Sequence, residues 1–303
     1  MSVRSAGTFA PSFKAGALWM LVSLACFTGN ALLLKHLGSD HGVSPWLALL
    51  FRALVGIAIV MLVSSPRTAA GGARRPALDL KRAATSRLLV SRGVLGAFGT
   101  AAYYVTLPVL GAGKATLIGN TWVIWSALMA VFVLKEHLAA RQIAGIVIAV
   151  GGLALLTGVD HHAEGGQTLH ELIAIAGALI AAATVVVIRQ LTRTESSTTI
   201  FASQCIYTAL LALPMVCAGA WRASGAEVAF LVIAAAAAGI GQIAMTEGFR
   251  HLPVTTGGAF QVAVPLCITL ASIALFGEPF TLVQGAGAAL IIVGGYQAVG
   301  RRV

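Results

Sequence analysis

The chain has 303 residues, of which 58% are hydrophobic and only 10% are charged, and its mean hydropathy is +0.91. A soluble domain of this length could not cover so much apolar surface with so few polar side chains, so the composition excludes a soluble fold and predicts a membrane protein. The net charge of +10 could indicate nucleic-acid binding, but the positions of the basic residues give that charge another meaning.

Ten apolar segments follow one another along the chain. A membrane core of about 30 Å requires about 20 apolar residues per helix, and continuously apolar segments favour helices over the alternating strands of a barrel. The first segment follows Arg4 and Lys14 and resembles a signal peptide, but nine more segments follow it, so we expect a retained helix. The predicted helices cover residues 15–35, 45–64, 87–108, 114–134, 141–158, 170–189, 199–219, 227–248, 254–276 and 280–299, and residues 65–86 are expected to form a cytoplasmic loop.

Lysine and arginine gather on one side of the expected membrane. With the N-terminus inside, 15 of the 20 basic residues fall on the inner side, three fall outside, and Arg52 and Arg92 lie within helices. This asymmetry follows the positive-inside rule and predicts that both termini are cytoplasmic, in a multi-pass protein of the cell inner membrane. The basic charge is therefore interpreted as an orientation signal, and no nucleic-acid partner is expected.

The two halves of the chain share a skeleton of four residues at a constant offset of 142. Five helices in each half is an odd number, so the second copy is expected to enter the membrane in the opposite orientation to the first. The sequence thus predicts two inverted five-helix repeats, residues 15–158 and 170–299, joined by an outer linker at 159–169, which is an arrangement typical of secondary transporters. The repeated residues are Glu136, Gln142, Gly145 and Gly152 in the first half and Glu278, Gln284, Gly287 and Gly294 in the second.

Three sequence features resemble a known family. Residues 134–145 match residues 276–287. Phe51–Arg52 lie early in the second helix and Arg92–Gly93 open the third, and residues 248–253 lead into the ninth helix. Together they resemble the ten-helix drug/metabolite transporter superfamily with two EamA domains, although Lys135 stands where the family usually has glycine. The resemblance implies that Glu136, Gly145, Glu278 and Gly287 form structural turn motifs. It leaves the substrate open, because the superfamily includes amino-acid and metabolite exporters, importers of vitamins and S-adenosylmethionine, and metallophore exporters.

Charged side chains inside the membrane are costly and are therefore functional candidates. Arg52 lies about 10 Å into the outer leaflet, and Arg92 lies about 7 to 8 Å from the cytoplasmic side, at about 1.5 Å per helical residue. Pairing or snorkelling could explain both, while substrate contact at Arg52 and gating at Arg92 are the functional alternatives. Glu247 lies three residues before Arg250 on one helix face, where either an ion pair or a proton-coupling carboxylate would fit.

Uncharged polar side chains within the helices form a second group of candidates. Their amides and aromatic rings could line a cavity for a small polar or zwitterionic solute, although hydrogen bonding between helices is the structural alternative. Asn120 and Gln261 occupy near-equivalent positions in the two repeats. The substrate-path candidates are Arg52, Asn30, Tyr103, Asn120, Trp122, Gln204, Tyr207, Gln242 and Gln261.

Three other patterns are not interpreted as sites. Residues 111–116 resemble a phosphate loop but lack its first glycine and its required hydroxyl, so no ATP site is expected. The acidic and histidine residues of 160–164 lie in a glycine-rich outer loop where solvation suffices, and the four cysteines have no metal-ligand spacing. We expect no cofactor, no metal and no catalytic residue.

The sequence therefore favours a secondary transporter that moves a small polar metabolite outward by alternating access, driven by the gradient of the solute or of protons. Uptake of a vitamin or an S-adenosylmethionine-like solute is the alternative within transporters, because cavity residues do not encode direction. A membrane-embedded enzyme is the alternative of another class, but it would need acidic or histidine groups clustered at one interface, and here the acids are scattered singly. A membrane subunit without transport activity is a further alternative, and no oligomeric state is predicted.

Overall fold

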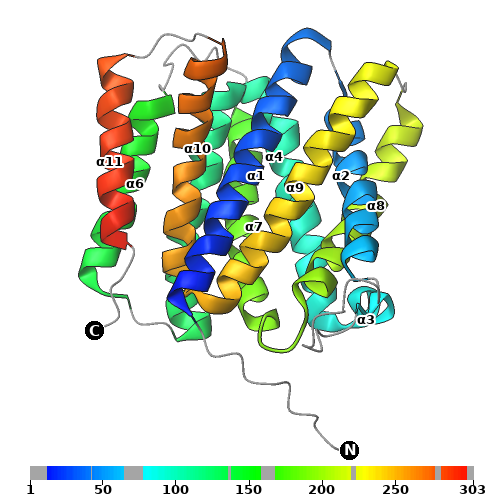
Figure 1. Cartoon of the computed structure of the whole chain (residues 1–303), viewed down its shortest axis with the longest axis horizontal. Coiled ribbons are helices and arrows are strands. Elements are labelled where there is room, and N and C mark those ends of the chain that lie inside the picture. The colour runs from blue at the N-terminus through cyan, green and yellow to red at the C-terminus, as the bar shows by residue number, and fades with distance from the viewer. Residues whose placement is uncertain are drawn as a thin grey trace, which may run out of the picture.

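The computed structural model of the chain is a bundle of helices (Figure 1) and describes residues 12–41, 43–64, 78–135, 138–157, 168–219, 223–276 and 281–298. All regular structure within these ranges is helical. The elements are α1 (Phe13–His41), α2 (Pro45–Val63), α3 (Leu80–Thr85), α4 (Arg87–Asn120), α5 (Trp122–Met129), the π-helix η2 (Ala130–Leu134), α6 (Ala140–Thr157), α7 (Thr168–Leu191), α8 (Ser197–Ala218), α9 (Gly225–His251), α10 (Val254–Phe276) and α11 (Leu282–Ala298).

The helices have the length and composition that a membrane requires. Seven stretches are long and apolar enough to cross it, and three shorter apolar helices cover Ile118–Leu134, Ala140–Leu156 and Leu282–Ala298. Together these segments follow the apolar runs of the sequence closely at both ends. The prediction of an all-helical, multi-pass membrane protein is therefore confirmed.

The third and fourth apolar segments differ from the prediction in how they are joined. The sequence predicts separate helices over 87–108 and 114–134, whereas α4 continues to Asn120 before α5 and η2 complete the second segment. Residues 103 and 119 would lie about 24 Å apart along a straight helix. A Cβ built on Gly119 would instead lie 3.6 Å from the ring of Tyr103, so the helical chain turns back between them.

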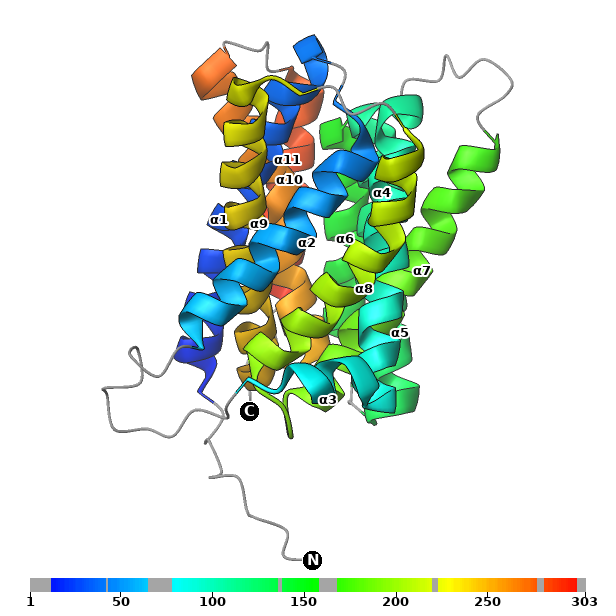
Figure 2. The same cartoon turned by 90° about the vertical axis from the view of Figure 1, so that its right-hand side faces the viewer.

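A short helix lies across one end of the bundle (Figure 2). The sequence interpretation treats residues 65–86 as loop throughout, but α3 occupies 80–85 within the described part of that segment. The carboxylate of Asp79 accepts a hydrogen bond of 2.8 Å from the backbone N–H of Arg82 and so caps the helix. The hydroxyl of Tyr207 donates a 3.0 Å hydrogen bond to the carbonyl of Ala84, which fixes α3 against α8.

Lys135 ends η2 in the left-handed region, with φ of 55°. It is the one non-glycine residue with positive φ among the described residues. Glycine is favoured at this position after a helix because a Cβ is strained there. The family glycine that Lys135 replaces is thus explained by backbone geometry, and the second copy has Gly277 at the corresponding position.

We expect Lys135→Gly to raise the free energy of unfolding by about 1 kcal/mol, because glycine adopts the left-handed conformation without the steric cost of a Cβ. Thermal unfolding of the detergent-purified protein would measure the change. Lys135→Ala removes the same charge and keeps the Cβ, so it should give no such gain. Equal stability of the two variants would show that the backbone at residue 135 is not strained.

The helices of the two halves pack in corresponding pairs. α1 packs on α9 and α10, and α2 packs on α9; in the same way α7 packs on α4 and α5, and α8 packs on α4. When each of these helices is replaced by its counterpart in the other half, every contact just named becomes another contact of the same set. The counterparts are α1 and α7, α2 and α8, α4 and α9, α5 and α10, and α6 and α11. Three further pairs, α2–α8, α5–α10 and α6–α11, join a helix to its own counterpart. The halves are therefore interleaved, and these contacts of one half correspond to contacts of the other.

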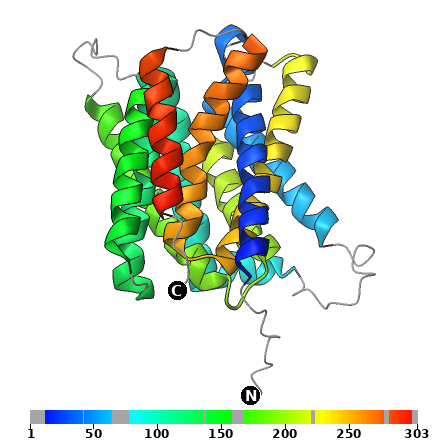
Figure 3. The same cartoon turned by 60° about the vertical axis from the view of Figure 1, so that its left-hand side comes forward.

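The repeated glycines lie at the contact between α6 and α11, which run side by side at one edge of the bundle (Figure 3). A Cβ on Gly145 would lie 2.6 Å from the carbonyl oxygen of Gly294, and a Cβ on Gly152 would lie 2.6 Å from that of Gly287. Early residues of one helix thus meet late residues of the other, so the two helices are antiparallel. The absence of side chains lets the two backbones touch, which is how small residues drive helix association in lipid.

Candidate functional site

One face of α4 carries a charged group at a buried position. Arg92, Gly96 and Thr100 are four residues apart and therefore share a face of the helix. The side chain of Arg92 is only 1% exposed. A Cβ on Gly96 would overlap Nη1 of Arg92, so the glycine leaves the space that the guanidinium occupies. The fold thus accommodates a full-length arginine inside the bundle.

Gln204 on α8 orients this arginine. Its Oε1 accepts a hydrogen bond of 2.8 Å from Nη2 of Arg92. Its Nε2 donates to Oγ1 of Thr100 at 3.2 Å and to the carbonyl of Gly96 at 3.4 Å. Because both ends of the amide are engaged, its oxygen is held toward the guanidinium. This polar contact joins the first half of the chain to the second.

The guanidinium of Arg92 keeps unused donors. Its Nε and Nη1 atoms are buried and have no hydrogen-bond partner. A buried N–H group without an acceptor costs about 1–3 kcal/mol, and more when the group is charged. The folded protein therefore carries an unfavourable free energy that a hydrogen-bond acceptor beside these two nitrogens would remove.

A second arginine lies nearby on α2. Arg52 is 9% exposed, and its helix packs on α8 where Gly56 faces the sulfur of Cys205. Arg52 lies one helical turn before Gly56 on α2, and Cys205 follows Gln204 on α8, so Arg52 and the Arg92–Gln204 contact both lie where α2 and α4 pack on α8. Within the described ranges, the ion pairs of the structure do not include a carboxylate bound to either arginine. Two positive charges thus share a buried region beside α8.

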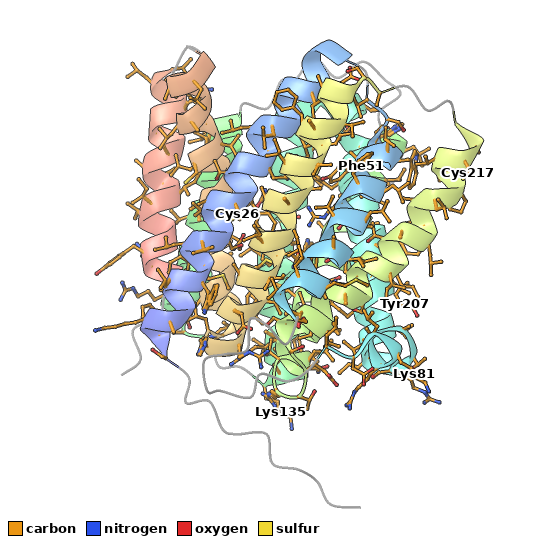
Figure 4. The ribbon with its side chains drawn as sticks, turned by 45° about the vertical axis from the view of Figure 1, so that its right-hand side comes forward. Cys26, Phe51, Lys81, Lys135, Tyr207 and Cys217 are labelled. Atoms are coloured by element: carbon orange, nitrogen blue, oxygen red, sulfur yellow. The ribbon has the colours of Figure 1, made fainter. Side chains whose placement is uncertain are left out.

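Figure 4 places this region along the bundle. Phe51, the neighbour of Arg52, lies on α2 away from the end that carries Lys81 and Lys135, and Tyr207 on α8 lies nearer that end. Cys217 marks the opposite end of α8. Arg52, the residue after Phe51, therefore lies away from the end of the bundle that carries Lys81 and Lys135.

Two other buried amides lie on α9 and α10. Gln261 on α10 is 5% exposed and donates to Oγ of Ser23 at 3.2 Å and to the sulfur of Met20 at 3.5 Å, both on α1. Gln242 on α9 is also 5% exposed, and its Nε2 has no partner. Asn30, one of the predicted path residues, is half-buried on α1. Like the arginine site, the Gln261 contact joins helices of opposite halves.

The predicted aromatic candidates do not gather at the arginines. Tyr103 is 38% exposed and meets Tyr104 edge to face, with ring centroids 6.2 Å apart. Asn120 is half-buried where α4 ends, and Trp122 packs against two apolar clusters of the core. The Tyr207 hydroxyl is bound to the carbonyl of Ala84, as described above. Of the predicted path residues, Gln204 binds Arg92 directly, and the ring of Tyr207 packs against Gly93, the next residue on α4.

Glu247 and Arg250 form the ion pair that their spacing predicts, with 3.1 Å between Oε2 and Nε. Nη1 of Arg250 also donates to the carbonyl of Thr192, and Nη2 donates to the carbonyl of Glu195 at 2.9 Å and to Oγ of Ser197 at 3.2 Å. The Glu195 carboxylate in turn binds Nε of Arg82 at 2.8 Å. This network, which we call the Arg250 network, ties the end of α9 to the turn between α7 and α8 and to α3.

Each of the remaining candidates either packs in a contact between helices or lies outside the described residues. Gly145 and Gly287 lie in the α6–α11 contact, whereas Glu136, Glu278 and the acidic and histidine residues of 160–164 lie outside the described residues. Among the described residues, no cluster of histidine, cysteine, aspartate or glutamate could hold a metal. A groove of about 560 Å³ lies on α6 and α11, at the opposite edge of the bundle from α8, and is lined by Arg141, Ile292, Val293, Tyr296 and Gln297.

Sequence reasoning missed three neighbours of the site. Thr100 and Ser23 bind the amides of Gln204 and Gln261, and Gly96 makes room for Arg92. The spacing of four residues from Arg92 through Gly96 to Thr100 could have identified the α4 face. Ser23 had no such signal, because its partner is far away in the sequence.

Comparison with known proteins identifies the class. A fold of apolar, interleaved helix pairs with buried polar contacts between halves is that of a multi-pass membrane protein. The model of the EamA-like transporter family matches residues 14–158 and again residues 168–298. The chain therefore belongs to the EamA-like transporter family, and it is a membrane transporter of the drug/metabolite kind.

Solved structures support the fold alone. One, described as "Crystal structure of protein", superposes with a TM-score of 0.77 at 20% sequence identity, over 95% of this chain and 97% of the other. A search of curated proteins found no match. The family and the fold are thus established together.

Proposed function

We propose that the protein is a secondary transporter that exports a small polar metabolite, amino-acid-like or zwitterionic, across the cell inner membrane. Two inverted five-helix halves, residues 15–158 and 170–299, alternate around a central path, and both termini are cytoplasmic. The corresponding helix pairs and the antiparallel contact of α6 with α11 support this arrangement.

One observation supports transport between the halves in particular. The buried polar contacts Arg92–Gln204 and Gln261–Ser23 each connect a helix of one half to a helix of the other. Polar groups are expensive in a membrane interior and mark solute or ion pathways. Rocking of one half against the other would open and close access to these groups, which is what alternating access requires.

Flux through reconstituted vesicles would test the proposal. Proteoliposomes loaded with a mixture of amino acids and other small polar metabolites should release some of them faster than protein-free vesicles, as measured by mass spectrometry of the external medium. Repeating the assay with a pH gradient, and with Glu247→Gln, would show whether protons drive the flux and whether Glu247 couples them. Accumulation against the proposed direction would favour uptake, and absence of protein-dependent flux under every condition would contradict a transporter of such solutes.

A further inference from the structure

The buried charges of Arg52 and Arg92 require a counter-charge that the described residues do not supply. Two like charges close together in a region of low dielectric repel each other strongly. The unsatisfied Nε and Nη1 of Arg92 add the cost of lost hydrogen bonds. Both costs fall when an anion binds between the groups, because each arginine then gains an opposite charge and an acceptor.

We propose that Arg52 and Arg92 bind an oxyanion group of the transported solute, a carboxylate or a phosphate monoester, and that Gln204 is the positioning residue of this site. The inference rests on the proposed transport function and names the substrate class. Guanidinium groups suit planar or tetrahedral oxyanions because they offer several donors in a fixed geometry. The Gln204 amide holds one nitrogen of Arg92, and the other two nitrogens are buried without a hydrogen-bond partner.

The location of the site links binding to alternating access. Arg52 on α2 and Arg92 on α4 belong to the first half, and Gln204 on α8 belongs to the second. A solute bound there contacts both halves, so its binding energy depends on how they are arranged. A neutral solute would leave the two charges unpaired, which makes the site selective for anionic groups.

Thermal unfolding of the full-length protein in lipid nanodiscs would test binding. Sodium acetate and sodium phosphate, each compared with sodium chloride at the same ionic strength, distinguish a carboxylate site from a phosphate site. We expect at least one of the two oxyanions to raise the melting temperature in a saturable way. Arg92→Gln and Arg52→Gln should each abolish that shift, and Arg193→Gln, at an exposed position near the end of α7, should retain it. No shift with either oxyanion, or an unchanged shift in Arg92→Gln, would overturn the proposal.

Stability without added oxyanion separates this role from a structural one. Arg92→Gln removes a buried charge with unsatisfied donors, so its melting temperature in chloride should equal or exceed that of the parent protein. A residue that serves packing or folding would instead lower it. A large decrease in Arg92→Gln together with an unchanged oxyanion shift in Arg52→Gln would contradict the proposal.

Flux distinguishes failure of this inference from failure of the proposed function. In the loaded proteoliposomes, solutes with a carboxylate or phosphate should cross, and each arginine variant should reduce their flux about tenfold or more, the effect of losing one charge-assisted hydrogen bond. Flux of amino-acid amides in preference to the amino acids, unaffected by Arg92→Gln, would refute the oxyanion site and leave transport intact. An oxyanion shift that depends on Arg92, without flux of any solute, would refute transport and leave the binding site intact.

Discussion

Gly152→Val is expected to abolish the folded, detergent-stable protein, whereas Gly151→Val at the adjacent position is expected to leave it unchanged. A Cβ on Gly152 would lie 2.6 Å from the carbonyl oxygen of Gly287 and 2.8 Å from the backbone nitrogen of Ile291. Backbone atoms cannot move aside as a flexible side chain can, so α6 and α11 would have to separate. We estimate a loss of about 3 kcal/mol or more, because overpacking and lost helix contacts add together.

The adjacent glycine gives a matched control. A Cβ on Gly151 would have no atom within 4 Å, and its position on α6 is exposed. Both substitutions change the same residue type in the same helix, so differences in intrinsic helix propensity cancel. Size-exclusion profiles and melting temperatures of the two purified variants would provide the comparison. Similar profiles would show that the α6–α11 contact is not as close as the structure indicates.

The repeated glycines show what the sequence could and could not predict about the fold. Their constant offset predicts a duplication, and their residue type predicts close packing. The sequence does not say that Gly145 meets Gly294 and that Gly152 meets Gly287, because this pairing depends on how two distant helices come together. The glycines of one copy of the duplicated motif thus pack against the glycines of the other copy.

Helix limits were predictable because each apolar segment must be long enough to cross the membrane. The depths of Arg52 and Arg92 in the membrane were counted from Pro45 and Arg87. These are the residues at which α2 and α4 begin. The turn back within α4 agrees with the two separate helices that the sequence predicts, but the continuation of helical structure through Pro108 to Asn120 was not predictable, because proline and glycine usually end a helix. Local residue preference there is overridden by tertiary packing.

The arginine site was predictable only in part. Composition marks Arg52 and Arg92 as exceptional because charge is costly in a membrane. Gln204 lies more than a hundred positions along the chain from both, so its contact with Arg92 follows from the packing of α4 on α8. Tyr207, although only three residues from Gln204, has its hydroxyl bound to α3 instead.

Arg250→Ala is the second substitution for which we expect a large effect, a decrease of about 3 kcal/mol in the free energy of unfolding. The Arg250 guanidinium joins the Glu247 carboxylate, the carbonyls of Thr192 and Glu195, and the hydroxyl of Ser197. Its side chain is 19% exposed, so water could replace only part of these bonds. Removing it leaves the turn between α7 and α8 without its link to α9, and leaves the Glu247 carboxylate without its cation.

Two further variants separate the geometry of the Arg250 network from its charge. Arg250→Lys keeps the charge but cannot reach several acceptors at once, so most of the loss should remain. Glu247→Gln keeps an oxygen that accepts from Nε of Arg250, so it should cost much less than Arg250→Ala. Melting temperatures of the purified variants would rank them in this order. If lysine restored full stability, the contribution of Arg250 would be one of charge, and the hydrogen bonds to the α7–α8 turn would add little.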